Sequence, residues 1–193
     1  MATGEELLSR LPGTFRYSEV LAHISERQLR RLIEEGSVVA LSRGVYRKHG
    51  WHGDEDLVEI AVKAPRATLC LRSALVRHEL IDDIPAEIDV AIPRGSWAPQ
   101  IAAPVRWRHF ALDSFDIGRG RLDLDGSHSI GMYSAERSIV DAFRMRHLDG
   151  PDLANEALKR WLRRGGQPSE LLDVARSFPR TQTALRETLE ILL

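Results

Sequence analysis

The first fifty residues alternate between short apolar clusters and turn-forming residues, a pattern that predicts short helices separated by tight links. Thr3 and Glu6 have the spacing of a capping box, and the leucines that follow predict a helix that a Pro-Gly pair ends. Residues 14–16 are expected to be extended. Ser18 is expected to cap a second short helix over residues 19–23.

The third helix is the best specified by the sequence. Ser25 stands at the N-cap position, Gln28 three residues later completes a capping box, and Gly36 suits the position just past the end. At about 100° per residue, the apolar side chains of this helix fall within one arc, which we expect to face a core. These apolar residues are Leu29, Leu32 and Ile33, and the opposite arc carries Arg27, Arg30, Arg31 and Glu34.

Two β-rich segments follow, residues 38–41 and 45–48, joined by a turn in which Gly44 is expected to supply a positive φ. Three short helices followed by a hairpin with a basic tip are typical of a winged helix-turn-helix. The polar, glycine-flanked stretch that begins at Gly50 predicts a domain boundary. We therefore expect a first domain over residues 1–50 and a second over residues 51–193.

The second domain begins with strand-like segments and ends in helices. Its predicted elements are a helix over 54–63, a strand start at 68–71 leading into a helix over 73–80, strands over 87–92 and 105–110, a hairpin over 121–132, and helices from Ser134 onward. A sheet followed by helices predicts a mixed α+β domain. The whole chain is thus expected to be α+β, with a winged helix at its N-terminus.

Composition excludes several classes of protein. The 193 residues are 43% hydrophobic and 28% charged, which is ordinary for a globular protein. No run of about 18 apolar residues is present for a membrane span, and the N-terminus lacks the pattern of a signal peptide, so a cytoplasmic protein is expected. The single cysteine, Cys70, lies in an apolar run and predicts a buried side chain.

Charge is unevenly distributed along the chain. Residues 1–50 carry eight Lys/Arg against six Asp/Glu, net +2, whereas residues 51–193 carry nineteen against twenty-two, net −3. The second helix of a helix-turn-helix enters the major groove of DNA, which points to Arg27, Arg30 and Arg31 as base or phosphate contacts. Glu34, one turn beyond Arg30, is expected to orient that arginine.

The hairpin extends the predicted interface. Its cations could hold the neighbouring DNA backbone: Arg43, Arg47 and Lys48. The alternative is a solvated basic face on a module that docks another protein, because winged helices serve both purposes.

A second basic cluster lies at the end of a C-terminal helix and comprises Lys159, Arg160, Arg163 and Arg164. Cations at this end of a helix are favoured by the helix dipole, which alone would explain them. The functional alternative is that these residues form a second surface that contacts phosphate groups.

Two sets of residues, one of acids with histidines and one of acids alone, have the composition of chemical sites. The first set, His49, His52, Asp54 and Asp56, has spacings that a metal site could use. It lies in a glycine-flanked linker without a scaffold for its ligands, so we predict neither a metal nor a cofactor.

The second set, Glu87 and Asp89, resembles the acidic strand of a nucleotidyltransferase or nuclease. Residues 66–80 contain no glycine for a phosphate-binding turn, and no Glu-x-Lys follows. The two acids are expected to form the wet face of a strand, and no catalytic residue is predicted.

Several segments together carry a resemblance to a known family. They are FRYSEV (15–20), ISERQLRRL (24–32) and RGVY (43–46), followed by LRSAL (71–75), AIPRG (91–95) and SAERSIVD (134–141). The chain resembles the AbiEi-type antitoxins of type IV toxin–antitoxin systems. The resemblance covers nearly the whole chain, and the last two segments are its most specific part.

The resemblance implies an antitoxin of a phage-defence system that binds inverted repeats in its own promoter and represses its operon. It further implies that the second domain neutralises a nucleotidyltransferase toxin of the AbiEii type, without the need for a stable complex. The expected state is a monomer that binds double-stranded DNA as paired copies. One alternative is a solitary winged-helix regulator whose second domain senses a ligand or partner. Another is a degenerate nucleotidyltransferase or nuclease.

Overall fold

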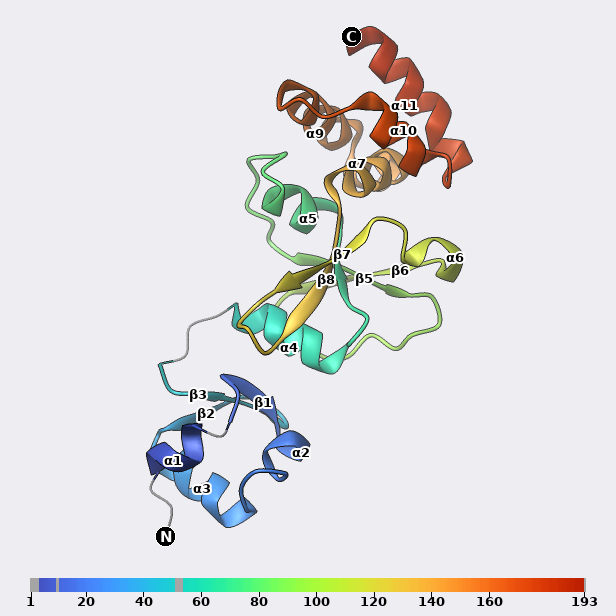
Figure 1. The fold of residues 1–193 in the computed structure, drawn as a ribbon. Helices are drawn as coiled ribbons and strands as arrows, with labels where there is room; N and C mark the ends of the chain where they lie inside the picture. The colour runs from blue at the N-terminus through green and yellow to red at the C-terminus, as the bar shows by residue number, and fades with distance from the viewer. Residues whose placement is uncertain (1–3, 10, 51–53, 193) are drawn as a thin grey trace. The chain divides into compact units, whose positions relative to one another are not determined.

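The computed structural model describes residues 4–9, 11–50 and 54–192 (Figure 1). It is a mixed α+β structure, as the sequence predicts. The chain divides into two compact units. The first comprises Met1–Pro65, Pro99–Ala102 and Leu122–Ile130, and the second comprises Arg66–Ala98, Ala103–Arg121 and Gly131–Leu193. The domain boundary at residue 50 stays a prediction.

The N-terminal part of the first unit has the order of elements expected of a winged helix. The elements are α1 (Gly4–Ser9), β1 (Thr14–Arg16), α2 (Tyr17–Val20), α3 (Glu26–Glu34), β2 (Val38–Ser42) and β3 (Val45–Lys48), and α4 (Glu55–Lys63) follows them. The strands form an antiparallel sheet in the order β1-β3-β2. Gly44 at the hairpin turn has a φ of +79°, as predicted.

The start of α2 differs from the prediction. Arg16, not Ser18, is the N-cap residue, because the backbone N–H of Arg16 donates to Glu19 Oε2 at 2.8 Å. Ser18 lies inside the helix, so the prediction that it caps α2 is wrong. Thr3, the predicted cap of α1, lies outside the described residues.

The winged helix has a small core of its own. Phe15, Leu29, Leu32 and Val38 are buried within one cluster, to which β1, α3 and β2 all contribute. The prediction for Leu29 and Leu32 is confirmed. The prediction for Ile33 is wrong, since it is 36% exposed. Ile33 lies at one edge of the apolar arc, which a domain this small leaves partly uncovered.

A second, five-stranded sheet has the order β6-β5-β4-β8-β7. Its strands are β4 (Thr68–Leu69), β5 (Ile88–Pro93), β6 (Val105–Phe110), β7 (Arg119–Asp123) and β8 (Ser129–Tyr133). β4 pairs antiparallel with β5 and parallel with β8, and β5 pairs parallel with β6. Cys70, just past β4, is completely buried, and this burial raises the pKa of its thiol.

Seven helices of the second unit complete the described fold. They are α5 (Leu71–Arg77), α6 (Leu112–Phe115), α7 (Ala135–Arg144), α8 (Arg146–Asp149), α9 (Pro151–Arg163), α10 (Pro168–Ala175) and α11 (Pro179–Leu192). Within the described residues, none of the helices has the length and apolar content needed to cross a bilayer.

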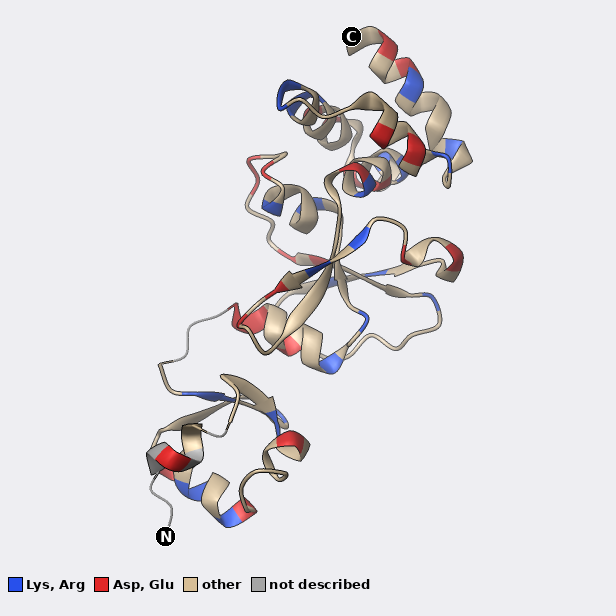
Figure 2. Ribbon diagram, in the orientation of Figure 1, with Lys and Arg blue, Asp and Glu red and all other residues tan. Residues whose placement is uncertain are grey.

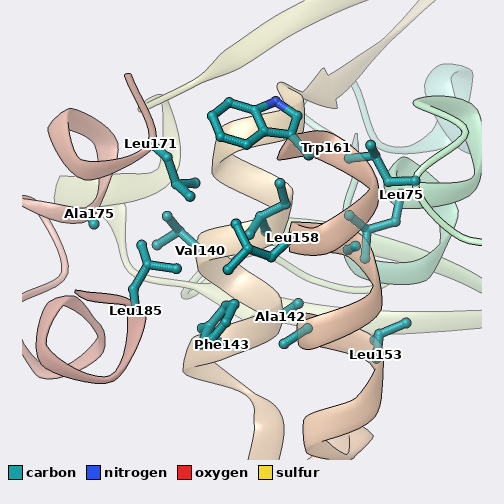
Figure 3. Close-up of a cluster of buried hydrophobic side chains, with 14 of the residues drawn as sticks. Leu75, Val140, Ala142, Phe143, Leu153, Leu158, Trp161, Leu171, Ala175 and Leu185 are labelled. Atoms are coloured by element: carbon teal, nitrogen blue, oxygen red, sulfur yellow. The ribbon is translucent and has the colours of Figure 1, made fainter. Parts of the chain in front are cut away.

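Helix α7 is the centre of the helical core (Figure 3). It contacts α5, α9, α10 and α11. Its residues Val140 and Phe143 are buried together with Leu158 of α9, Leu171 of α10 and Leu185 of α11. Ser134 caps α7 by accepting a hydrogen bond from the Arg137 backbone, as the sequence predicts.

Arg137 is a charged residue inside this unit, with no exposed surface. Its Nε donates to Asp141 Oδ2 at 2.9 Å, and its Nη1 donates to the carbonyl oxygens of Ser114 and Ile117 at 2.6 and 2.7 Å. The guanidinium carbon also lies 4.4 Å from the centre of the Tyr133 ring. The side chain therefore joins α7 to the segment around α6 and to β8.

The close approach of Trp161 to Gly166 generates a prediction about stability. A Cβ atom on Gly166 would lie 2.2 Å from Trp161 Cδ2, so Gly166→Ala should displace the buried indole and lower the free energy of unfolding by about 1–3 kcal/mol. Gly120→Ala is the matched control, because its Cβ would meet only Met132 O at 3.5 Å. Urea denaturation of both variants measures the difference in stability. Equal denaturation midpoints for the two variants would contradict the close packing of Trp161 against Gly166.

Candidate nucleic-acid interface

The N-terminus of α3 is fixed by the capping box that the sequence predicts. The Gln28 backbone N–H donates to Ser25 Oγ at 3.3 Å, and the Ser25 N–H donates to Gln28 Oε1 at 2.8 Å. Gly36 ends the helix with a φ of +71°. Because Leu29 and Leu32 anchor the opposite face in the core, the polar face of α3 is held toward solvent.

The three arginines of this face are all exposed. Arg30 forms an ion pair with Glu26 at 3.2 Å and Arg31 with Glu35 at 2.8 Å, so each of these arginines has a carboxylate one turn away, and α3 carries both basic and acidic positions (Figure 2). The prediction that Glu34 orients Arg30 is wrong, because Glu26, one turn earlier, takes that place. Exposed pairs of this spacing contribute only about 0.3–0.5 kcal/mol, so both guanidiniums can exchange their partner for a phosphate.

The cations of the hairpin have different surroundings. Arg43 is exposed at the turn between β2 and β3. Arg47 points to the same face of β3 as Val45, where Val58 and Val62 of α4 pack, and its guanidinium forms an ion pair with Glu55. Lys48 is half-buried, and this burial lowers the pKa of its ammonium group. Arg43 is thus free to contact DNA at the tip of the hairpin, whereas Arg47 is paired with Glu55 of α4.

The C-terminal basic cluster is partly neutralised. Arg160 binds both carboxylate oxygens of Asp82, at 2.6 and 2.7 Å, and Arg164 pairs with Glu79 at 3.1 Å. Lys159 and Arg163 are exposed on the same helix. The prediction of a second phosphate-contacting surface therefore depends mainly on these two residues.

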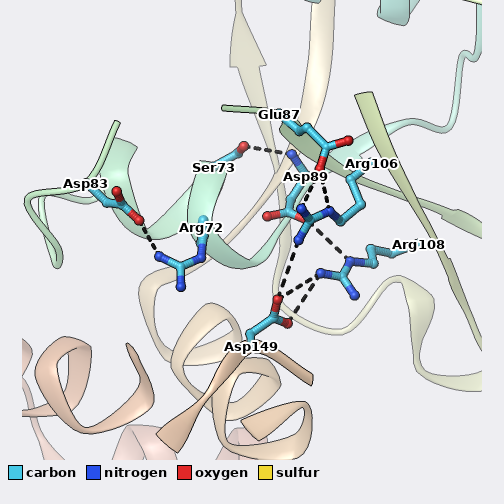
Figure 4. A network of polar contacts seen from close by, with 8 residues as sticks. All are labelled: Arg72, Ser73, Asp83, Glu87, Asp89, Arg106, Arg108 and Asp149. Atoms are coloured by element: carbon cyan, nitrogen blue, oxygen red, sulfur yellow. Dashed lines mark hydrogen bonds and ion pairs between the residues drawn. The ribbon is translucent and has the colours of Figure 1, made fainter. Parts of the chain in front are cut away.

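The acids of β5 do not form the wet face that the sequence predicts (Figure 4). Asp89 is only 2% exposed. Its carboxylate accepts a hydrogen bond from Arg108 Nε at 3.2 Å, and Arg108 Nη2 also reaches Asp149 at 3.0 Å. Burial raises the pKa of Asp89, although Arg108 acts in the opposite direction. The prediction fails because both faces of β5 are covered: all residues from 89 to 93 are buried, and Ser73 of α5 accepts a hydrogen bond from the Asp89 backbone.

Glu87, at the entry to β5, is paired with Arg106. Both acids of this strand are therefore engaged by arginines. The described residues hold no group of three or more side chains placed to bind a metal ion. Asp54, a candidate ligand from the sequence, caps α4 by accepting from the Leu57 N–H at 3.3 Å. His52 lies outside the described residues.

A capped helix with exposed arginines, together with a three-stranded antiparallel sheet whose β2–β3 hairpin forms the wing, defines a winged helix-turn-helix module. The family described as "Transcriptional regulator, AbiEi antitoxin" matches residues 5–47, which run from α1 into β3. The match confirms the resemblance to AbiEi-type antitoxins for these residues, and its description is of a regulator rather than an enzyme. No curated protein matches the chain.

The observed caps generate a prediction with an internal control. Ser25→Ala removes the acceptor for the first turn of α3 and should lower the free energy of unfolding by about 1 kcal/mol. Ser18→Ala should leave it unchanged or raise it slightly, because Ser18 lies inside α2 and alanine is the better helix former. Thermal denaturation by circular dichroism compares the two. A larger loss of stability in the Ser18 variant than in the Ser25 variant would indicate that Ser18, and not Arg16, caps α2.

Proposed function

We propose that this protein is a DNA-binding antitoxin that represses its own operon through the winged helix. The observation that carries the proposal is the exposed arginine face of α3 within a module that matches the AbiEi antitoxin regulators. A helix of this kind places its N-terminal residues nearest the base edges. Arg27, in the first turn of α3, is then the best placed for bidentate contact with a guanine.

Phosphate contacts would supply most of the affinity. Arg30 and Arg31 lie farther along α3, and Arg43 lies at the tip of the wing. Guanidiniums bind phosphate in a bidentate manner and fix the orientation of the protein on the duplex. The operator is an inverted repeat, because a monomer that binds as paired copies needs two half-sites of opposite orientation.

The second part of the proposal is that residues 51–193 neutralise a nucleotidyltransferase toxin of the AbiEii type. This part rests on the resemblance of the segments at 71–75, 91–95 and 134–141, and on the net charge of −3 in this region, which does not favour a second duplex-binding domain. The helical core around α7 belongs to a compact unit that contains most of this region.

A second candidate function is a solitary winged-helix regulator without a toxin. The range of the family match favours it, because the match ends at residue 47 and leaves the rest of the chain unassigned. In that case the second unit would sense a ligand or another protein.

DNA binding should depend strongly on salt. If the arginines of α3 and the wing neutralise about 4 phosphates, log K should fall against log salt with a slope of about −3.6. Fluorescence anisotropy with the DNA upstream of the gene for this chain measures the slope. The combined variant Arg27→Ala, Arg30→Ala and Arg31→Ala should bind weakly and give a slope closer to zero.

The matched control removes three exposed arginines outside the winged helix: Arg121, Arg176 and Arg186. It changes net charge by the same amount and should retain most of the operator affinity and the slope. A flat salt response of the unchanged protein, or equal losses in both triple variants, would contradict a DNA interface on α3.

Neutralisation should be separable from repression. In cells that express a cognate nucleotidyltransferase toxin of the AbiEii type, co-expression of this chain should restore growth. The α3 triple-alanine variant should restore it as well, because its second unit is unchanged. A reporter fused to the promoter should be derepressed only in that variant. Absence of protection by the unchanged chain would favour the solitary regulator, and loss of protection in the folded variant would contradict the division of labour.

A further inference from the structure

The second unit contains a cavity whose lining has one sign of charge. Its volume is about 680 Å³, and it lies where the end of α7, α8 and the start of α11 meet. Its arginines are Arg144, Arg146 and Arg180, and no acidic residue lines it. The sequence shows no sign of this site, because these residues are up to 36 positions apart and belong to no motif.

The cations of this cavity differ from most other arginines of the unit. Arg146 and Arg180 are exposed, and within the described part of the chain their side chains form neither an ion pair nor a hydrogen bond. By contrast, Arg72, Arg106 and Arg160 are paired with carboxylates. Within the described residues, the charges of Arg146 and Arg180 therefore have no carboxylate partner.

Arg144 is held in place before any ligand arrives. Its Nη1 lies 3.2 Å from Asp141 Oδ1, and its guanidinium carbon lies 4.7 Å from the Phe110 ring centre and 5.0 Å from that of Phe178. A guanidinium fixed in this way loses little conformational entropy when it binds an anion. The first turn of α11, residues 179–181, also lines the cavity, and the N-terminal end of a helix favours negative charge.

The remaining lining is apolar. Phe143, Phe178, Pro179 and Ala184 contribute to it, so a ligand that fills the cavity needs a non-polar body as well as a negative charge. The volume falls in the range of about 300–1,000 Å³ that small-molecule sites occupy. Three arginines around one space balance a polyanion better than a single carboxylate.

We propose that this cavity binds an organic phosphate of the nucleotide type, with the phosphate on Arg144, Arg146 and Arg180 and the ring system on the apolar wall. A duplex backbone is the weaker match, because it is convex and has no non-polar body to fill a cavity. The proposal is independent of the function proposed for α3, since the winged helix contributes no residue to the lining.

Isothermal titration of the full chain with AMP and ATP tests the proposal, with adenosine and inorganic phosphate as partial ligands. AMP and ATP should bind, adenosine should bind at least about tenfold more weakly, and phosphate should compete with AMP. Arg180→Ala and Arg146→Ala should each weaken AMP binding by about tenfold. Arg186→Ala is the matched control, because Arg186 lies exposed on the same helix, outside the cavity, and should bind AMP as the unchanged protein does.

Three results would overturn the proposal. The first is no binding of AMP or ATP at millimolar concentration. The second is equal AMP affinity in the cavity variants and in the Arg186 control, with cooperative thermal denaturation showing that all are folded. The third is loss of operator affinity in the cavity variants without nucleotide binding, which would assign these arginines to the DNA backbone. Loss of operator binding confined to the α3 variants would leave the proposal intact.

Discussion

The second unit depends on the burial of Arg137. A guanidinium without water must find acceptors in the protein, and Asp141 and two backbone carbonyl groups supply them. The ring of Tyr133 lies against the same group. This requirement fixes α7 against β8 and the segment around α6. Helices α9, α10 and α11 then pack against the apolar face of α7. Removal of Asp141 would leave the buried guanidinium without its carboxylate partner, at a cost of about 3–5 kcal/mol.

The two units use arginine in different ways. On α3 the arginines are exposed, and their pairs with Glu26 and Glu35 are short-range surface contacts that a phosphate can replace. In the second unit, arginines such as Arg108 and Arg160 join strands, helices and loops through carboxylates. Arg146 and Arg180, which line the cavity, have no such carboxylate partner within the described residues. Net charge along the sequence cannot distinguish these roles, because each depends on which acid lies nearby in space.

Local chemistry accounts for the predictions that succeeded. The Ser25 and Gln28 capping box, the positive φ at Gly44 and the Ser134 cap each involve residues within a few positions of one another. Such hydrogen bonds and φ preferences act over one turn and need no tertiary context. The prediction for Ser18 failed because Arg16 and Ser18 were both possible N-cap positions, and the Glu19 side chain accepts a hydrogen bond from the Arg16 N–H.

The sequence by itself determined most of the order of helices and strands, the winged helix and the arginine face of α3, since periodicity and caps are local properties. It did not predict the short helices α6 and α8. Only the tertiary structure decided the position of Asp89: the alternation along the strand predicts exposure, but both faces of β5 are covered and Asp89 is buried beside Arg108. It likewise decided that Arg47 pairs with Glu55 and that Arg180 lines the same cavity as Arg144 and Arg146. Burial and charge pairing depend on which elements become neighbours, and the pattern along a single strand or helix does not contain that information.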